Sequence, residues 1–146
     1  MGQLDKFKNK QEFILLCEAG FIAVNQMDED AAKKLFEASA LLDPKNELPQ
    51  IGFGYLHLCK LELKQAAECF NKVLVEMPDN DMAKAFLGLA QSLSPTEGAK
   101  GEKLLEETAT KAKDPGIKTL AASALEFVDK FIKKKTPPAE LQKPKK

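Results

Sequence analysis

Few side chains in this chain have the types and spacing that covalent or metal chemistry requires. His57 stands two residues before Cys59, and residues i and i+2 of a helix do not face each other, so this pair is not predicted to hold a metal. The three cysteines, at positions 17, 59 and 69, form no C-x-x-C motif and lie among apolar residues. No serine, cysteine or acid occurs in a local pattern that would activate it. The sequence therefore predicts no enzyme, no cofactor and no metal site, and a packed or half-exposed His57.

The charged residues also argue against a nucleic-acid partner. Twenty-two basic residues, all of them lysine, balance 22 acids. Without arginine the chain lacks the planar fork that binds phosphate through two hydrogen bonds. The lysine excess is confined to the last segment, where residues 117–146 contain eight lysines and three acids. Within it, the lysine run at residues 133–135 could touch an acidic partner or nucleic acid, but it has neither interleaved aromatic residues nor arginine, so we interpret it as part of a solubilising tail.

Cysteine usage and the amino terminus predict the compartment. An odd number of unpaired thiols suits a reducing environment. The first residues, Met1 to Lys6, contain no apolar run of the kind needed for export, and no apolar stretch approaches the roughly 20 residues that span a bilayer. We therefore expect a cytoplasmic protein that does not insert into a membrane.

The elements that position these side chains are predicted to be helices that recur at a fixed interval. Apolar residues follow helical spacing nearly throughout, and no segment alternates as a strand would. Gly20, Gly54 and Gly88 are equally spaced, and the same interval, which we call the repeat period, relates Ala32 to Ala66, Phe36 to Phe70 and Pro44 to Pro78. Glycine has no Cβ, so these positions would let two helices approach closely, with Ala32 and Ala66 as the opposing small surface. The phenylalanines would fill the space between neighbouring units.

The predicted helices cover residues 10–26, 29–42 with Asp28 as N-cap, 48–60 and 64–75, followed by a third unit and a final helix at 117–134. The third unit has a longer turn at residues 92–98. If the repeat period is applied strictly, Lys100 and Leu104 occupy the places of Ala66 and Phe70. We expect residues 1–135 to form one helical repeat domain, and the Pro- and Lys-rich residues 136–146 to be a disordered tail.

Over residues 13–113 these glycines, alanines, phenylalanines and prolines resemble the tetratricopeptide repeat family, whose units of about 34 residues have the same period. The resemblance implies an all-α, right-handed superhelix of three helix pairs, closed by a C-terminal capping helix. Leu16, Gln50 and Lys84 stand where the family usually has a large aromatic residue, so the repeats are divergent. In this family the first helix of each unit lines the concave face.

The family architecture also implies which side chains face that groove. They are the second, fifth, ninth and twelfth residues of units that start at Phe13, Glu47 and Asp81, namely Ile14, Cys17, Phe21, Val24, Leu48, Ile51, Tyr55, Leu58, Met82, Ala85, Leu89 and Ser92. All except the serine are apolar or aromatic, whereas a solvated concave face would be polar. The lysine, asparagine and arginine clamp of relatives that bind a chaperone C-terminus is absent. Two interpretations remain: the groove binds the apolar face of an amphipathic helix, or the chain fills it with its own segments.

A short chain with three divergent units, a capping helix and an apolar groove resembles the small chaperones of bacterial type III secretion. The resemblance points to the class that protects the needle-filament subunit. It implies a cytoplasmic bacterial protein whose groove binds an amphipathic helix of a secreted needle-type subunit and prevents premature polymerisation. It further implies a small helical co-chaperone. The alternatives are a translocator-class secretion chaperone, a general tetratricopeptide scaffold and a self-associating adaptor.

Overall fold

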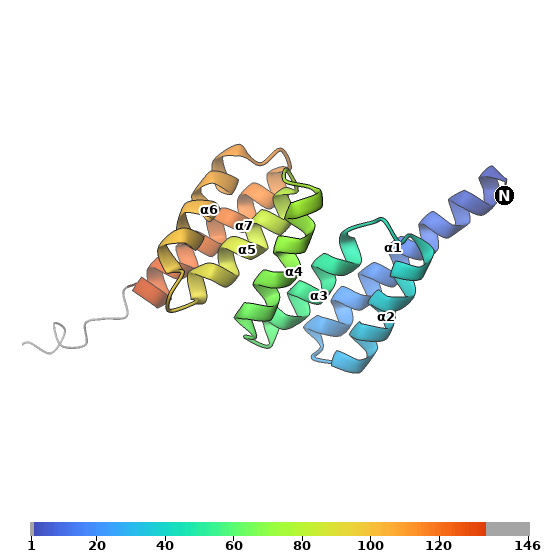
Figure 1. The fold of residues 1–146 in the computed structure, drawn as a ribbon, viewed down its shortest axis with the longest axis horizontal. Helices are drawn as coiled ribbons and strands as arrows, with labels where there is room; N and C mark the ends of the chain where they lie inside the picture. The colour runs from blue at the N-terminus through green and yellow to red at the C-terminus, as the bar shows by residue number, and fades with distance from the viewer. Residues whose placement is uncertain (1, 134–146) are drawn as a thin grey trace, which may run out of the picture. The chain divides into compact units, whose positions relative to one another are not determined.

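The computed structural model describes residues 2–133, which form seven α-helices and a short π-helical segment (Figure 1). The elements are α1 (Gln3–Asn25), α2 (Glu29–Leu42), α3 (Leu48–Cys59), α4 (Leu63–Glu76), α5 (Asp81–Leu93), α6 (Gly98–Lys111), α7 (Pro115–Phe127) and η1 (Val128–Lys133). The described residues contain no strand, so the all-α prediction is confirmed. The predicted tail at residues 136–146 lies outside the described residues.

The chain divides into two compact units, Met1–Ala83 and Lys84–Lys146, and the boundary falls within α5. In the first unit α1 packs along α2, α3 packs along α4, and α3 also contacts both helices of the first pair. In the second unit α6 packs against α7. The first unit therefore contains two consecutive helix pairs, and they provide most of the predicted groove residues.

The turns that follow α1 and α3 lie one repeat period apart and have the same backbone conformation. Met27 and Leu61 both lie in the left-handed region, with φ of 63° and 60°. In each turn the next backbone N–H donates to the carbonyl five residues earlier, at 2.8 Å from Asp28 to Ala23 and at 2.9 Å from Glu62 to His57. This bond is the hallmark of a Schellman helix end. The sequence period is thus also a period of backbone structure.

Replacing either left-handed residue by glycine should stabilise the protein. Met27 and Leu61 are 90% and 70% exposed, so Met27→Gly and Leu61→Gly remove little buried surface. A residue with a Cβ pays about 1 kcal/mol to adopt this conformation, and glycine does not. We expect each variant to raise the free energy of unfolding by about 1 kcal/mol in urea titrations followed by circular dichroism. Lys34→Gly, in the middle of α2, should lower it by a similar amount; an equal loss in all three variants would contradict the prediction.

The core of the first unit is built from phenylalanine rings that pack against glycines. A Cβ added to Gly20 would lie 2.5 Å from the Phe36 ring, and one added to Gly54 would lie 2.5 Å from the Phe70 ring. A Cβ on Gly52 would also meet the Phe36 ring. Phe36 of α2 therefore sits between α1 and α3 and fills the space between the two helix pairs, as the sequence predicts.

The second unit repeats this arrangement with a shift of one residue. Leu105 is completely buried, and a Cβ on Gly88 would lie 2.8 Å from its Cγ. Gly101 is buried against the backbone of α5, whereas Lys100 is exposed and Leu104 is only half-buried. The assignment of Lys100 and Leu104 to the places of Ala66 and Phe70 was therefore wrong.

The proline in the preceding turn explains the shift. Pro95 occupies, by strict spacing, the place of Met27 and Leu61. The pyrrolidine ring fixes φ at a negative value, so proline cannot adopt the left-handed conformation that closes the two earlier turns. The turn between α5 and α6 is built differently, with Ser94 Oγ within 3.3 Å of Thr96 Oγ1, and the buried row of α6 then falls one residue later.

The contact between Gly101 and α5 makes a second stability prediction. A Cβ on Gly101 would clash with the backbone N of Ser92 and would lie 2.5 Å from the Gly88 carbonyl oxygen. Backbone atoms cannot move aside cheaply, so Gly101→Ala should lower the free energy of unfolding by about 1–3 kcal/mol. Gly98→Ala is the matched control, because its nearest neighbour would be 3.9 Å away. If thermal melts show the two variants to be equally stable, α5 and α6 do not cross this closely.

The predicted helix boundaries need two corrections. α1 begins at Gln3 rather than near Lys10, because residues 3–12 contain no glycine or proline and consist mainly of residues that tolerate a helix well. The predicted final helix is α7 followed by the π-helical η1. The predicted N-cap is confirmed, since Asp28 Oδ1 accepts a hydrogen bond of 3.0 Å from the Ala31 backbone N–H.

Candidate functional site

The predicted groove residues separate into two sets. Cys17, Val24, Ile51, Leu58, Ala85 and Ser92 are buried, whereas Ile14, Phe21, Leu48, Tyr55, Met82 and Leu89 are exposed or half-buried. The accessible set consists of the second and ninth residues of each unit, and the buried set consists of the fifth and twelfth. Residues seven apart lie almost in line on a helix, whereas residues three apart are turned by about 60°. Half of the predicted groove residues therefore belong to the core. The other half form one accessible row on the first helix of each unit.

In the first unit, the accessible rows of α1 and α3 form what we call the α1–α3 apolar surface, which consists of Ile14, Phe21, Leu48 and Tyr55. The Phe21 and Tyr55 rings are 5.6 Å apart between centroids. Phe21 also packs edge-on against the buried Phe36 ring, with a centroid separation of 5.2 Å. These contacts anchor the aromatic end of the surface on the core.

Tyr55 has a polar contact at the edge of this surface. Its hydroxyl donates a hydrogen bond of 2.7 Å to Asn25 Oδ1. Burial of the ring, followed by the nearby Cys59 thiol, raises the pKa of Tyr55 above its usual value. The phenol therefore stays protonated at neutral pH and acts as a hydrogen-bond donor on an otherwise apolar surface.

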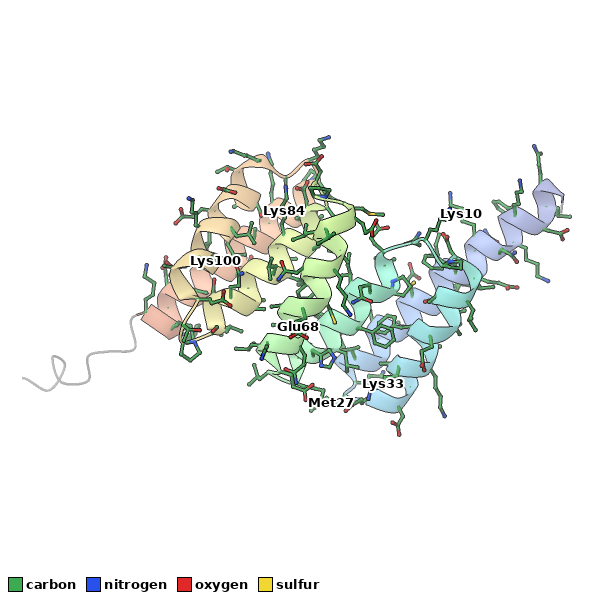
Figure 2. The ribbon with its side chains drawn as sticks, viewed as in Figure 1. Lys10, Met27, Lys33, Glu68, Lys84 and Lys100 are labelled. Atoms are coloured by element: carbon green, nitrogen blue, oxygen red, sulfur yellow. The ribbon has the colours of Figure 1, made fainter. Side chains whose placement is uncertain are left out.

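The aliphatic end of the α1–α3 apolar surface borders a cleft of about 470 Å³. Ile14 and Leu48 line it together with Lys6, Asn9, Lys10, Phe13, Leu42, Asp43 and Asn46. Figure 2 shows Lys10 at one end of the α1–α2 pair and Met27 in the turn at the other end. The surface thus runs along α1 and α3 toward a cleft whose lining combines apolar side chains with two lysines and one aspartate.

A second cleft, of about 750 Å³, lies between the α2–α3 loop and the end of α4. It is lined by Pro44, Lys45, Glu47, Gln50, Lys72, Val73, Val75, Glu76 and Met77. Four of these residues follow lining residues of the first cleft by one repeat period. The two clefts therefore occupy comparable places in successive helix pairs, and the second one lies away from the α1–α3 apolar surface.

Phe7 is an accessible aromatic residue that the sequence reasoning missed. It lies one heptad before Ile14 and is exposed. The spacing of Phe7, Ile14 and Phe21 is the signal that could have found it, but a helix that starts near Lys10 leaves Phe7 outside. Because α1 begins at Gln3, the apolar row continues by two more turns.

The titratable residues form an ion-pair network at the turns after α1 and α3. Lys60 Nζ lies 2.9 Å from Glu29 Oε1 and 3.2 Å from Glu62 Oε1. Hydrogen bonds from Lys33 and Lys60 lower the pKa of Glu29 to about 2. His57 Nδ1 lies 2.8 Å from Glu62 Oε1, and the half-exposed side chain confirms the prediction for this histidine. The network links α2 to α3 at the surface.

The cysteines are placed mainly as packing groups. Cys17 is buried and Cys69 is half-buried, and burial raises the pKa of both thiols. Both therefore remain protonated near neutral pH, and Cys59 is exposed. Among residues 2–133 no three or more histidine, cysteine, aspartate or glutamate side chains are grouped so that they could hold a metal ion.

The chain matches no protein-family model and none of the curated proteins. Within the part of the chain that the structure describes, no helix has both the length and the apolar character needed to cross a bilayer. The protein is accordingly identified by its architecture: it is an all-α protein of consecutive helix pairs that carries an accessible apolar surface on α1 and α3.

Proposed function

We propose that this protein is a cytoplasmic chaperone of bacterial type III secretion, of the class that protects the needle-filament subunit. Its α1–α3 apolar surface binds one face of an amphipathic helix of that subunit and keeps the subunit from polymerising before export. As the resemblance implies, a small helical co-chaperone works with it.

The repeat character supports the tetratricopeptide-like superhelix on which this proposal rests. The repeat period appears in the φ values of Met27 and Leu61, in the helix-end hydrogen bonds and in the pairing of Gly20 and Gly54 with phenylalanine rings. A unit of this kind buries its apolar face by stacking on the next one, and such stacks offer an extended binding surface.

The single observation that carries the proposal is the accessible apolar row on each of two adjacent helices. Ile14 and Leu48 share one cleft, and Phe21 and Tyr55 share a ring contact. A bound amphipathic helix presents its own anchors at i, i+3, i+4 and i+7, and apolar rows on two adjacent helices offer such a helix a surface to pack against. Aromatic anchors of this kind carry much of the binding free energy in helix-in-groove complexes.

A polymerisation assay tests the proposal. The full chain is mixed at equal concentration with the purified needle-type subunit encoded by the same genome, and filament growth is followed by light scattering. We expect a one-to-one complex in size-exclusion chromatography and suppressed scattering, while an unrelated helical-repeat protein leaves filament growth unchanged. Unchanged growth together with separate elution of the two proteins would refute the proposal.

A further inference from the structure

One face of α1 exposes large apolar side chains away from the core. Leu4, Leu15 and Ile22 are 80%, 64% and 56% exposed. The buried residues of α1, which include Phe13, Cys17 and Gly20, lie on a different side of the helix. Exposed leucine and isoleucine side chains in line make this face a candidate for contact with another molecule.

The open face has the spacing of a two-helix seam. Steps of four and three residues relate its exposed positions, which are Leu4, Lys8, Gln11, Leu15, Glu18 and Ile22. This alternation places the six side chains in one row along the helix, as at the a and d positions of a coiled coil, but with apolar side chains at only three of the six positions. All six side chains are exposed, so none is used by the chain's own packing.

Half of α1 has little support from its own chain. Residues 3–12 are exposed except for the half-buried Asn9, and Figure 1 shows the first turns of α1 extending past the end of α2. An isolated helix of about ten residues is marginal in water. The second half of α1 is supported by α2 and α3. A partner that covers both halves would stabilise the unsupported one.

We propose that this face pairs with the same face of α1 in a second copy of the chain. The two helices run antiparallel, and the two-fold axis that relates them passes at the level of Phe13. Each unsupported half then packs on the supported half of the other copy. The layers of this pairing are Leu4 with Ile22 of the second copy, Lys8 with its Glu18, and Gln11 with its Leu15, each occurring twice. A two-fold interface requires such a self-complementary surface.

The two charges in the seam select the second copy and its direction. In the antiparallel pairing each Lys8 faces a Glu18, whereas a parallel pairing would place lysine opposite lysine and glutamate opposite glutamate. Among the described residues Lys8 makes one marginal ion pair, with Nζ 4.0 Å from Glu12 Oε1 and side chains that are 73% and 47% exposed. An exposed pair of this kind contributes little, so Lys8 is available to a partner.

Sedimentation velocity on the full chain tests this pairing. As the protein concentration is raised from about 1 to about 500 μM, the mass should rise from 16.1 kDa toward twice that value. Lys8→Glu and Glu18→Lys should each weaken self-association by about tenfold or more, because each variant places like charges opposite each other. Combining both substitutions restores opposite charges in both charged layers and should recover self-association to within about threefold of the original.

Lys34→Glu, an exposed charge reversal on α2, is the control and should leave the dimer intact. All substituted side chains are exposed, and equal helicity by circular dichroism shows that each variant folds. A chain that stays monomeric at every concentration, as it would if this face binds only a different helical protein, overturns the inference. So does a double variant that fails to recover the dimer. Ile14, Phe21, Leu48 and Tyr55 are not among the six positions of this face, so capture of a needle-type helix is measured independently.

Discussion

Phe36→Ala will lower the free energy of unfolding by about 3–5 kcal/mol, the range observed when a fully buried phenylalanine is truncated. The Phe36 side chain is completely buried, and it occupies space left open by Gly20 and Gly52. The Phe21 and Phe53 rings pack on it at centroid distances of 5.2 and 5.5 Å. Glycine has no side chain that could move into the cavity, so the cavity persists. Chemical denaturation followed by far-ultraviolet circular dichroism measures the loss.

The matched control for this prediction is Leu41→Ala on the same helix. Leu41 is 83% exposed, so its truncation should change the free energy of unfolding by less than about 0.5 kcal/mol. Domains of this kind are stabilised by about 5–15 kcal/mol in total, so the loss at Phe36 is a large fraction. A loss below about 1.5 kcal/mol would show that α1 and α3 collapse onto the vacated space, and that the glycine contacts do not define the joint between the helix pairs.

The second large effect concerns helix capture. Ile14→Asp will weaken binding of a needle-subunit helix peptide by about 100-fold or more, the loss expected when a charge replaces an apolar anchor that the bound helix covers. Ile14 is 41% exposed and borders the cleft on the α1–α3 apolar surface, so the substitution places a charge at the surface without emptying the core. Fluorescence anisotropy with a labelled peptide measures the affinity, and circular dichroism confirms unchanged helicity.

Three other substitutions sharpen this test. Val75→Asp introduces the same charge at an exposed apolar position of α4, outside the α1–α3 apolar surface, and should leave peptide binding unchanged. Leu58→Asp is unsuitable as a groove variant, because Leu58 is buried and the charge would disrupt packing. Phe21→Asp would combine both effects, since Phe21 packs on Phe36. Equal affinities for Ile14→Asp and Val75→Asp would show that this surface is not the binding site.

Several features of the fold could be predicted from the residues themselves because they depend on local chemistry. The regular spacing of glycine and phenylalanine correctly indicated which helices approach closely, as the contacts of Gly20 with Phe36 and of Gly54 with Phe70 show. The Asp28 cap was also predictable, since an aspartate side chain satisfies a free backbone N–H at a helix start.

The site was predicted less completely, because a period relates equivalent residues without telling which way they face. Ile14 and Cys17 both matched the groove template, yet the first is exposed and the second is buried. They differ by about 60° around the helix axis, and only the packing of α2 and α3 against α1 decides which direction is covered. Phe7 was missed for a related reason, because nothing local marks the true start of α1.

The residues alone thus determined that this chain forms helices, that they recur with a fixed period, and that small residues lie where helices approach closely; that the glycines meet phenylalanine rings was seen only in the structure. Only the tertiary structure decided the rotation of each helix, the one-residue shift that places Leu105 in the core, and the open face of α1. The physical reason is that helix propensity and small-residue contacts act within a few residues. Burial, by contrast, depends on neighbours that are distant in sequence, and a single proline in a turn is enough to change their register.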